Sequence, residues 1–185
     1  MTSKVRIIGG KYRGKMLSFP NQTDLRPTPS RVRETVFNWL MHDIRNADCL
    51  DAFAGSGALG FEAYSRGAKS VTLLEAAKET FLCLKASAKD FDTSALKIIH
   101  TKAESFLEKS RDTYNIIFLD PPFKDPNTLM NCINLIAQAK LLKPNGMLYT
   151  ESPKPIQLPH DIWETHREKT TGDVTYALHV NLEFK

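Results

Sequence analysis

The sequence contains no run of 18 or more apolar residues, so it offers no candidate transmembrane helix. The N-terminal segment MTSKVRIIGGKYRGK carries basic residues but lacks an apolar signal core, so we expect no export and a cytoplasmic location. Cysteine is also scarce, and Cys49, Cys83 and Cys132 lie far apart among apolar neighbours, which indicates reduced, buried thiols. The five histidines show no ligand spacing, and we expect no metal site and no membrane partner.

Acidic residues are nearly absent from the first 33 positions. This segment holds one acid, Asp24, against eight basic residues, whereas the whole chain has a net charge of only +4. The rest of the chain is therefore mildly acidic. A basic arm of this kind predicts a polyanionic partner, whose phosphates it neutralises, although a solvated basic tail explains the same charges.

Beyond residue 46 the chain alternates between strand and helix patterns. At 185 residues, with 42% hydrophobic and 25% charged residues, it is long enough for one well-packed domain. The segments ADCLDAFAG, KSVTLLEA, ALKIIHTKA, YNIIFLD and GMLYTES predict five buried strands, and helical segments separate them. This βα alternation predicts a doubly wound parallel sheet of the α/β class.

The two ends of the chain follow different patterns. KVRIIGGKYRGKMLSF predicts two short strands around Gly9-Gly10, and a proline-rich loop follows. Thr28 fits an N-cap and Pro29 the first position of an amphipathic helix that continues to about residue 46. WETHREKTTGDVTYALHVNLEF predicts an antiparallel hairpin at the sheet edge. We therefore expect a basic extension over residues 1–45 and an α/β domain over residues 46–185.

A glycine-rich loop, LDAFAGSGALG, connects the first predicted strand to a helix. Residues 55–60 satisfy the G-x-G-x-x-G dinucleotide pattern, and Glu75 ends the second strand where a ribose-binding acid is expected. A nicotinamide-dependent oxidoreductase is thus one interpretation. Asp51 argues against it, because a carboxylate repels a diphosphate but holds a cationic amino group, and Phe53 narrows the approach. Nothing downstream resembles a hydride-transfer site.

The stretch IIFLDPPFKD places an acid and two prolines after the fourth strand. Pro121 and Pro122 lack N–H donors, so the local backbone presents carbonyl acceptors. An exocyclic amino group could donate to the Asp120 carboxylate and to the Pro121 carbonyl, while Phe123 stacks on the attached ring. A strand-ending turn is the plain alternative. Together with the glycine loop and Glu75, the stretch favours an amino-directed methyltransferase.

These motifs resemble those of class I S-adenosylmethionine-dependent methyltransferases, and D-P-P-F resembles the motif of their amino-directed members. More specifically, IIGGKYRGKML, LRPTPSRVRETVFNWL, LDAFAGSGALGFEAYSRGA, FLDPPF and REKTTGDVTYAL resemble the bacterial 16S ribosomal RNA guanine-N2 methyltransferase family. The resemblance implies a Rossmann-like fold with a mostly parallel seven-stranded sheet, and S-adenosylmethionine as cofactor. It also implies methylation of the 2-amino group of guanine 966 in 16S rRNA, within the 30S subunit or its assembly intermediate. We expect a monomer.

The resemblance also implies residue roles. Target-amine handling maps to Asp120, Pro121, Pro122 and Phe123. Cofactor binding maps to Asp51, Phe53, Gly55, Ser56, Gly57, Glu75, Ala76, Ala103 and Glu104. The LRPT segment, with Arg26 and Thr28, is expected to close over the active site, and the candidate RNA contacts are Lys4, Lys11, Arg13, Arg26, Thr28, Arg31 and Arg33. DNA adenine, protein glutamine and RNA binding without catalysis remain alternatives.

Overall fold

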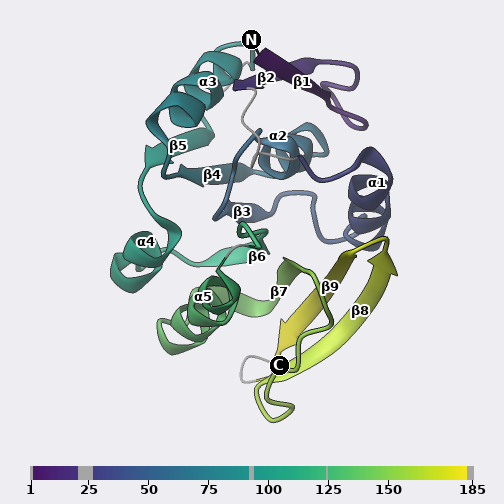
Figure 1. The fold of residues 1–185 in the computed structure, drawn as a ribbon, viewed down its shortest axis with the longest axis vertical. Coiled ribbons are helices and arrows are strands. Elements are labelled where there is room, and N and C mark those ends of the chain that lie inside the picture. Colours follow the sequence, from purple (N-terminus) through teal and green to yellow (C-terminus); the bar gives the residue numbers. More distant parts are fainter. Residues whose placement is uncertain (1, 21–26, 92–93, 124, 183–185) are drawn as a thin grey trace.

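The computed structural model describes residues 2–20, 27–91, 94–123 and 125–182. The main sheet has seven strands in the order β5-β4-β3-β6-β7-β9-β8 (Figure 1). Five of them run parallel, and their bounds are β3 (Asp48–Asp51), β4 (Ser70–Glu75), β5 (Leu96–His100), β6 (Tyr114–Leu119) and β7 (Leu142–Ser152). The antiparallel strands β8 (Trp163–Thr171) and β9 (Val174–Asn181) complete the sheet. The predicted doubly wound fold with a C-terminal hairpin is confirmed.

Helices cover both faces of this sheet. The helices α1 (Ser30–Trp39), α2 (Ala58–Ser65) and α3 (Lys78–Ala88) share one apolar core, while α4 (Ala103–Lys109) and α5 (Pro126–Gln138) share the other. Successive strand residues point to opposite faces, so Leu73 joins the first core and Leu74 the second. Both faces being buried explains why the parallel strands read as continuous apolar runs.

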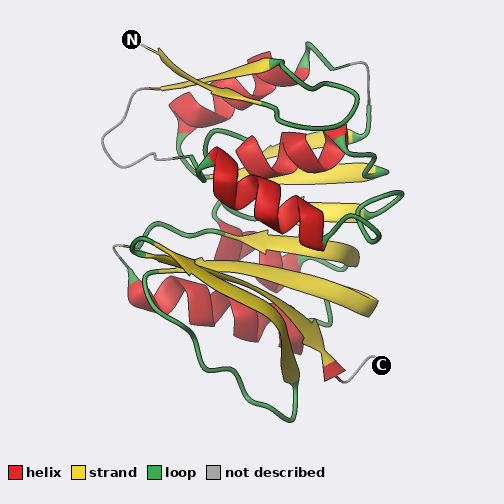
Figure 2. Ribbon diagram, turned by 90° about the vertical axis from the view of Figure 1, so that its right-hand side faces the viewer, coloured by secondary structure: helices red, strands yellow, loops and turns green. Residues whose placement is uncertain are grey.

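The N-terminal extension begins with a hairpin of β1 (Thr2–Arg6) and β2 (Met16–Pro20), which lies at the end of the molecule opposite to β8 and β9 (Figures 1 and 2). The turn is longer than predicted, because residues 7–15 all lie between the strands. The hairpin contributes Val5, Ile7 and Leu17 to the first core. The extension and the sheet therefore share apolar packing, and the division at residue 45 stays a prediction.

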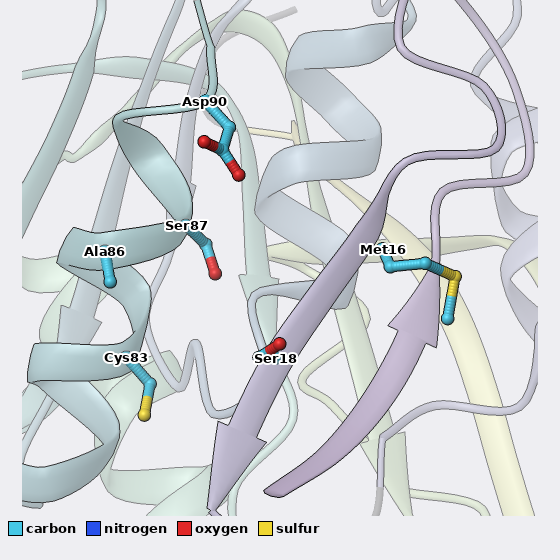
Figure 3. A pocket seen from close by; sticks show the side chains of 6 residues that line it. All are labelled: Met16, Ser18, Cys83, Ala86, Ser87 and Asp90. Atoms are coloured by element: carbon cyan, nitrogen blue, oxygen red, sulfur yellow. The ribbon is translucent and has the colours of Figure 1, made fainter.

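Strand β2 lies against α3. A cavity of about 200 Å³ separates them and is lined by Met16, Ser18, Cys83, Ala86, Ser87 and Asp90 (Figure 3). Lys15 also donates a hydrogen bond to the Asp90 carbonyl. This hydrogen bond ties the hairpin to the turn after α3, near the β5 end of the sheet and away from β7.

Three boundaries differ from the sequence expectations. Helix α1 begins at Ser30 after Pro29, and no side chain caps it, so the prediction of Thr28 as N-cap is wrong. The sequence predicts that this helix continues to about residue 46, but it ends at Trp39, and residues 40–46 form non-helical turns and a bend. Strand β7 begins at Leu142, before the predicted strand GMLYTES, and its pairing with β6 shifts register between Leu142 and Met147. Among the described residues, no helix is long and apolar enough to cross a bilayer.

Candidate active site at the carboxyl edge of the sheet

Four acidic side chains stand at or beside the carboxyl ends of neighbouring parallel strands. Asp51 and Glu75 end β3 and β4, and Asp120 follows β6 directly. The register pairs Leu119 with Thr150, so Asp120 and Glu151 are the next residues along β6 and β7. In open α/β sheets this edge is where ligands bind. The predicted acids Asp51, Glu75 and Asp120 are thus brought together, and Glu151 joins them.

The glycine loop is held by two of these carboxylates. The Gly60 N–H donates to Asp51 Oδ2 over 2.9 Å, and the Gly55 N–H donates to Glu75 Oε2 over 3.0 Å. Gly57 has φ +77°, and a Cβ there would lie 2.4 Å from the Phe61 ring. Position 57 therefore requires glycine for both backbone and packing reasons. The acids preorganise the loop that precedes α2.

The remaining cofactor candidates lie around this loop. Ser56 is buried and accepts a hydrogen bond from Ala58 N–H, while Phe53 is half-buried. The Ala77 N–H donates to Glu75 Oε1 over 2.7 Å, so Glu75 also shapes the turn at Ala76. Ala103 is buried at the start of α4 and Glu104 is half-buried beside it. The assignment of these residues to cofactor binding stays a prediction.

The Asp120 carboxylate contacts the N-terminal extension. The Thr28 hydroxyl lies 2.9 Å from Glu151 Oε1 and 3.4 Å from Asp120 Oδ2. Tyr149 donates a second hydrogen bond to Glu151 Oε1, also over 2.9 Å. Four oxygen-bearing side chains from three segments are therefore linked across the ends of β6 and β7.

Burial and mutual repulsion perturb these acids. Burial, and then the charges of Glu151 and Asp51, raise the pKa of Asp120 well above its usual value. Burial also raises the pKa of Glu151, although the bonds from Tyr149 and Thr28 oppose the shift. The pKa of Asp51 rises from 3.8 to about 7, mainly because its carboxyl is buried. Carboxyl groups gathered in a poorly solvated edge resist ionising together, and such groups are typical of functional sites.

A cavity of about 210 Å³ opens beside Asp120. Its lining combines the proline turn, the start of α5 and the segment after β7: Pro121, Pro122, Phe123, Asp125, Leu129, Met130, Glu151, Ser152, Pro153, Lys154, Pro155 and Ile156. Phe123 is 43% exposed, which is unusual for a large apolar ring and leaves it available for stacking. The cavity thus opens at the proline turn that directly follows Asp120, with the Phe123 ring in its lining.

The candidate RNA contacts divide into three groups. Lys4, Lys11, Arg13 and Arg31 are exposed, and Arg26 lies outside the described residues. Thr28 is 5% exposed, and its hydroxyl is engaged by the two carboxylates. Arg33 is 1% exposed and bonds to Glu62 and to backbone carbonyls, so its expected role as a surface RNA contact is wrong.

Sequence reasoning missed Glu151 and its partner Tyr149. The available signal was the segment GMLYTES, in which an acid ends an apolar strand just as Glu75 and Asp120 do. Among the described residues, no cluster of His, Cys, Asp and Glu could hold a metal ion.

This chain is similar to known proteins over nearly its whole length. The family model described as "Conserved hypothetical protein 95" matches residues 5–180. The protein "Ribosomal RNA small subunit methyltransferase D" of Haemophilus influenzae is 44% identical over 184 residues, covering 96% of this chain and 94% of that protein. Its namesake in Escherichia coli K12 is 41% identical over 180 residues, covering 96% and 90%. This chain belongs to the ribosomal RNA small subunit methyltransferase D family.

A solved structure supports the same assignment. That of Escherichia coli yhhF superposes with a TM-score of 0.89 at 41% identity and covers 97% of this chain and 98% of that one. The match covers nearly the whole of both chains, so the two proteins share the whole architecture. Membership in this family disfavours the oxidoreductase interpretation of the glycine loop.

Proposed function

We propose that this protein transfers a methyl group from S-adenosylmethionine to the exocyclic 2-amino group of a guanine in small-subunit rRNA. The observation that carries the proposal is the position of Asp120. It stands in an Asp-Pro-Pro-Phe turn, at the same sheet edge as the loop that Glu75 and Asp51 hold. An amino-group acceptor and a nucleoside-binding loop are thus adjacent. The names of the family's relatives supply the substrate class.

The residues at the edge suit S-adenosylmethionine by the chemistry of their groups. Glu75 offers carboxylate acceptors for ribose hydroxyls, and the acids at the edge favour a cationic ligand. In this proposal Asp51, at the end of β3, holds the ligand's amino group, and Ala103 and Glu104, at the start of α4, contact the adenine. The bound cofactor supplies an electrophilic methyl group on a sulfonium.

The chain's own residues then act by positioning the amine. Asp120 and the Pro121 carbonyl accept the two N–H bonds of the target amino group, and Phe123 stacks on the ring. These contacts orient the nitrogen lone pair toward the methyl donor's site, and orientation of this kind lowers a barrier by several kcal/mol. The amine loses one proton when it is methylated, and Asp120 is placed to receive it.

The exposed basic residues extend the site toward RNA. Lys4, Lys11 and Arg13 lie on the hairpin, and Arg31 lies on α1 after the Thr28 segment. Their charges favour a phosphate backbone running from the hairpin to the carboxyl edge. We propose the 16S rRNA of a 30S subunit or assembly intermediate as substrate, with guanine 966 as target, and a cytoplasmic monomer as the active species.

Incubation with labelled S-adenosylmethionine tests the proposal. Small subunits from cells that lack the protein should become labelled in 16S rRNA, and digestion should yield N2-methylguanine at one position. Free 16S rRNA, duplex DNA and a peptide substrate, assayed in parallel, separate the alternatives. Folded protein that binds S-adenosylhomocysteine but labels none of the RNA substrates contradicts the proposal.

A further inference from the structure

Thr28 occupies a position that the proposed reaction does not by itself explain. Its hydroxyl stands between carboxylates from two strands, 2.9 Å from Glu151 and 3.4 Å from Asp120. A threonine hydroxyl has one proton to donate. The shorter contact shows that Glu151 is the better acceptor, so Glu151 determines where the Thr28 oxygen sits relative to Asp120.

The backbone of Thr28 is fixed as well. Its carbonyl accepts a hydrogen bond from Arg33 Nε over 3.1 Å, and prolines on both sides restrict its backbone. Arg33 in turn donates to the Arg6 carbonyl over 3.0 Å and pairs with Glu62. The Thr28 backbone is therefore anchored to α1 and, through Arg33, to Arg6 and Glu62.

We propose that Glu151 is a positioning residue that acts through the Thr28 hydroxyl to fix the Asp120 carboxylate for the target amine. The inference rests on the proposed methyl transfer. Among the described residues, the Thr28 hydroxyl is the one side-chain group in hydrogen-bonding distance of the Asp120 carboxylate, and its bond to Glu151 holds the hydroxyl oxygen in that place. Without this hydroxyl, the Asp120 carboxylate could rotate about its side-chain bonds, and the aligned geometry would be lost.

Glu151 also affects the ionisation of the Asp120 carboxyl group. The groups that face Asp120 are Thr28 from the extension, Asp51 from β3, and Glu151 and Tyr149 from β7. The Glu151 charge disfavours ionisation of Asp120, which suits a group that takes up the proton lost by the methylated amine. Glu151 therefore influences Asp120 in two ways, by geometry through Thr28 and by charge through space.

A double-mutant cycle tests whether Glu151 acts through Thr28 or whether the two residues act independently. Thr28→Val removes the hydroxyl but keeps the side chain's shape, and we expect kcat to fall about 10- to 100-fold with little change in the KM for S-adenosylmethionine. Glu151→Ala should give a similar loss. Because the geometric effect of Glu151 passes through Thr28, the double variant should be no slower than Glu151→Ala alone. Losses that multiply in the double variant overturn the inference.

Conservative variants give measurements, namely the rescue of activity and the pH profile of kcat, that would not change if the two residues were only structural. Thr28→Ser keeps the hydroxyl and should restore most of the activity. Glu151→Gln keeps an oxygen for Thr28 and Tyr149 but removes the charge, so the acidic limb of the kcat–pH profile should move to lower pH. An unchanged limb, or no rescue by serine, contradicts the proposal even if Glu151→Ala fails to fold.

Thr170→Val is a matched control, since it removes a threonine hydroxyl that bonds to Thr175 on the C-terminal hairpin. It should leave kcat unchanged. If folded wild-type protein does not methylate small subunits, the proposed function itself is wrong. If the wild-type protein is active but the effects of Thr28 and Glu151 are independent, only this inference is wrong.

Discussion

Arg33 and Glu62 form an ion pair of 3.3 Å in which the side chains are only 1% and 0% exposed. It joins the N-terminal extension to α2, the helix that follows the glycine loop. Glu62 also accepts hydrogen bonds from Arg66 over 2.7 Å and from the Ile8 N–H over 2.9 Å. The pair therefore holds the basic hairpin, the Thr28 segment and the helix that follows the glycine loop in one arrangement.

Removing Arg33 should destabilise the fold. Arg33→Met leaves Glu62 buried with fewer donors and orphans the Thr28 and Arg6 carbonyls, so we expect a loss of about 3 kcal/mol in the free energy of unfolding. Urea titration followed by circular dichroism measures the change. Arg31→Met, an exposed position on the same helix, is the matched control and should change stability by less than about 0.5 kcal/mol. Equal effects at the two positions contradict the structural role of Arg33.

Replacing Asp120 tests catalysis apart from cofactor binding. Asp120→Ala removes the acceptor for the target amine, and we expect kcat to fall by about 100-fold or more. Affinity for S-adenosylhomocysteine, measured by calorimetry, should change little, because Glu75 and the glycine loop remain intact. Should cofactor affinity and folding collapse together, the plain interpretation of this stretch as a strand-ending turn regains support.

Glu75 is expected to dominate cofactor affinity. Both of its oxygens accept backbone N–H bonds, from Gly55 and Ala77, and a glutamine would turn an N–H₂ group toward one of those donors. Glu75→Gln should therefore weaken S-adenosylhomocysteine binding about 10- to 100-fold. Glu108→Gln, an exposed position on α4, serves as the control. Tight binding of NAD(H) instead would favour the oxidoreductase alternative.

The exposed basic residues of the hairpin should control RNA affinity through salt. Changing Lys4, Lys11 and Arg13 together to alanine removes up to three phosphate contacts. The slope of log affinity against log salt should then become shallower by about 2. Binding of undermethylated small subunits across a salt series measures it. Alanine at Lys109, Arg111 and Lys140 removes the same charge elsewhere, and an equal change in slope there would show that only net charge matters.

Much of the fold follows from local patterns in the sequence. The parallel strands inside the sheet, β3, β4, β6 and β7, are largely buried apolar runs separated by helical segments, whereas the outermost strand β5 is only half-buried. An acid at the end of such a run falls at the carboxyl edge of the sheet. The amino-acid pattern alone therefore brings Asp51, Glu75 and Asp120 together. Glu151 follows the same rule at the end of β7 and was recoverable from GMLYTES.

Thr28 and Arg33 could not be assigned in that way. A threonine before a helix is usually an N-cap, yet its hydroxyl bonds to Glu151, which is 123 residues away in the chain. Arg33 shares a helix face with Val36, Phe37 and Leu40, and that spacing signals burial. The spacing does not identify Glu62, whose carboxylate pairs with the Arg33 guanidinium and offsets the cost of burying its charge.

The raised pKa of Asp51 predicts an unusual pH dependence of stability. Between its ordinary pKa of 3.8 and about 7, the native protein holds a proton that the unfolded chain has released. Stability of the cofactor-free protein should therefore fall as pH rises through this window, by up to about 4 kcal/mol from this group alone. Asp51→Asn removes the titration, so the difference in unfolding free energy between pH 5 and pH 8 should shrink, with the variant the more stable protein at pH 8. A wild-type protein that gains stability over this range, with the variant following it in parallel, would show that Asp51 is ionised in the native state.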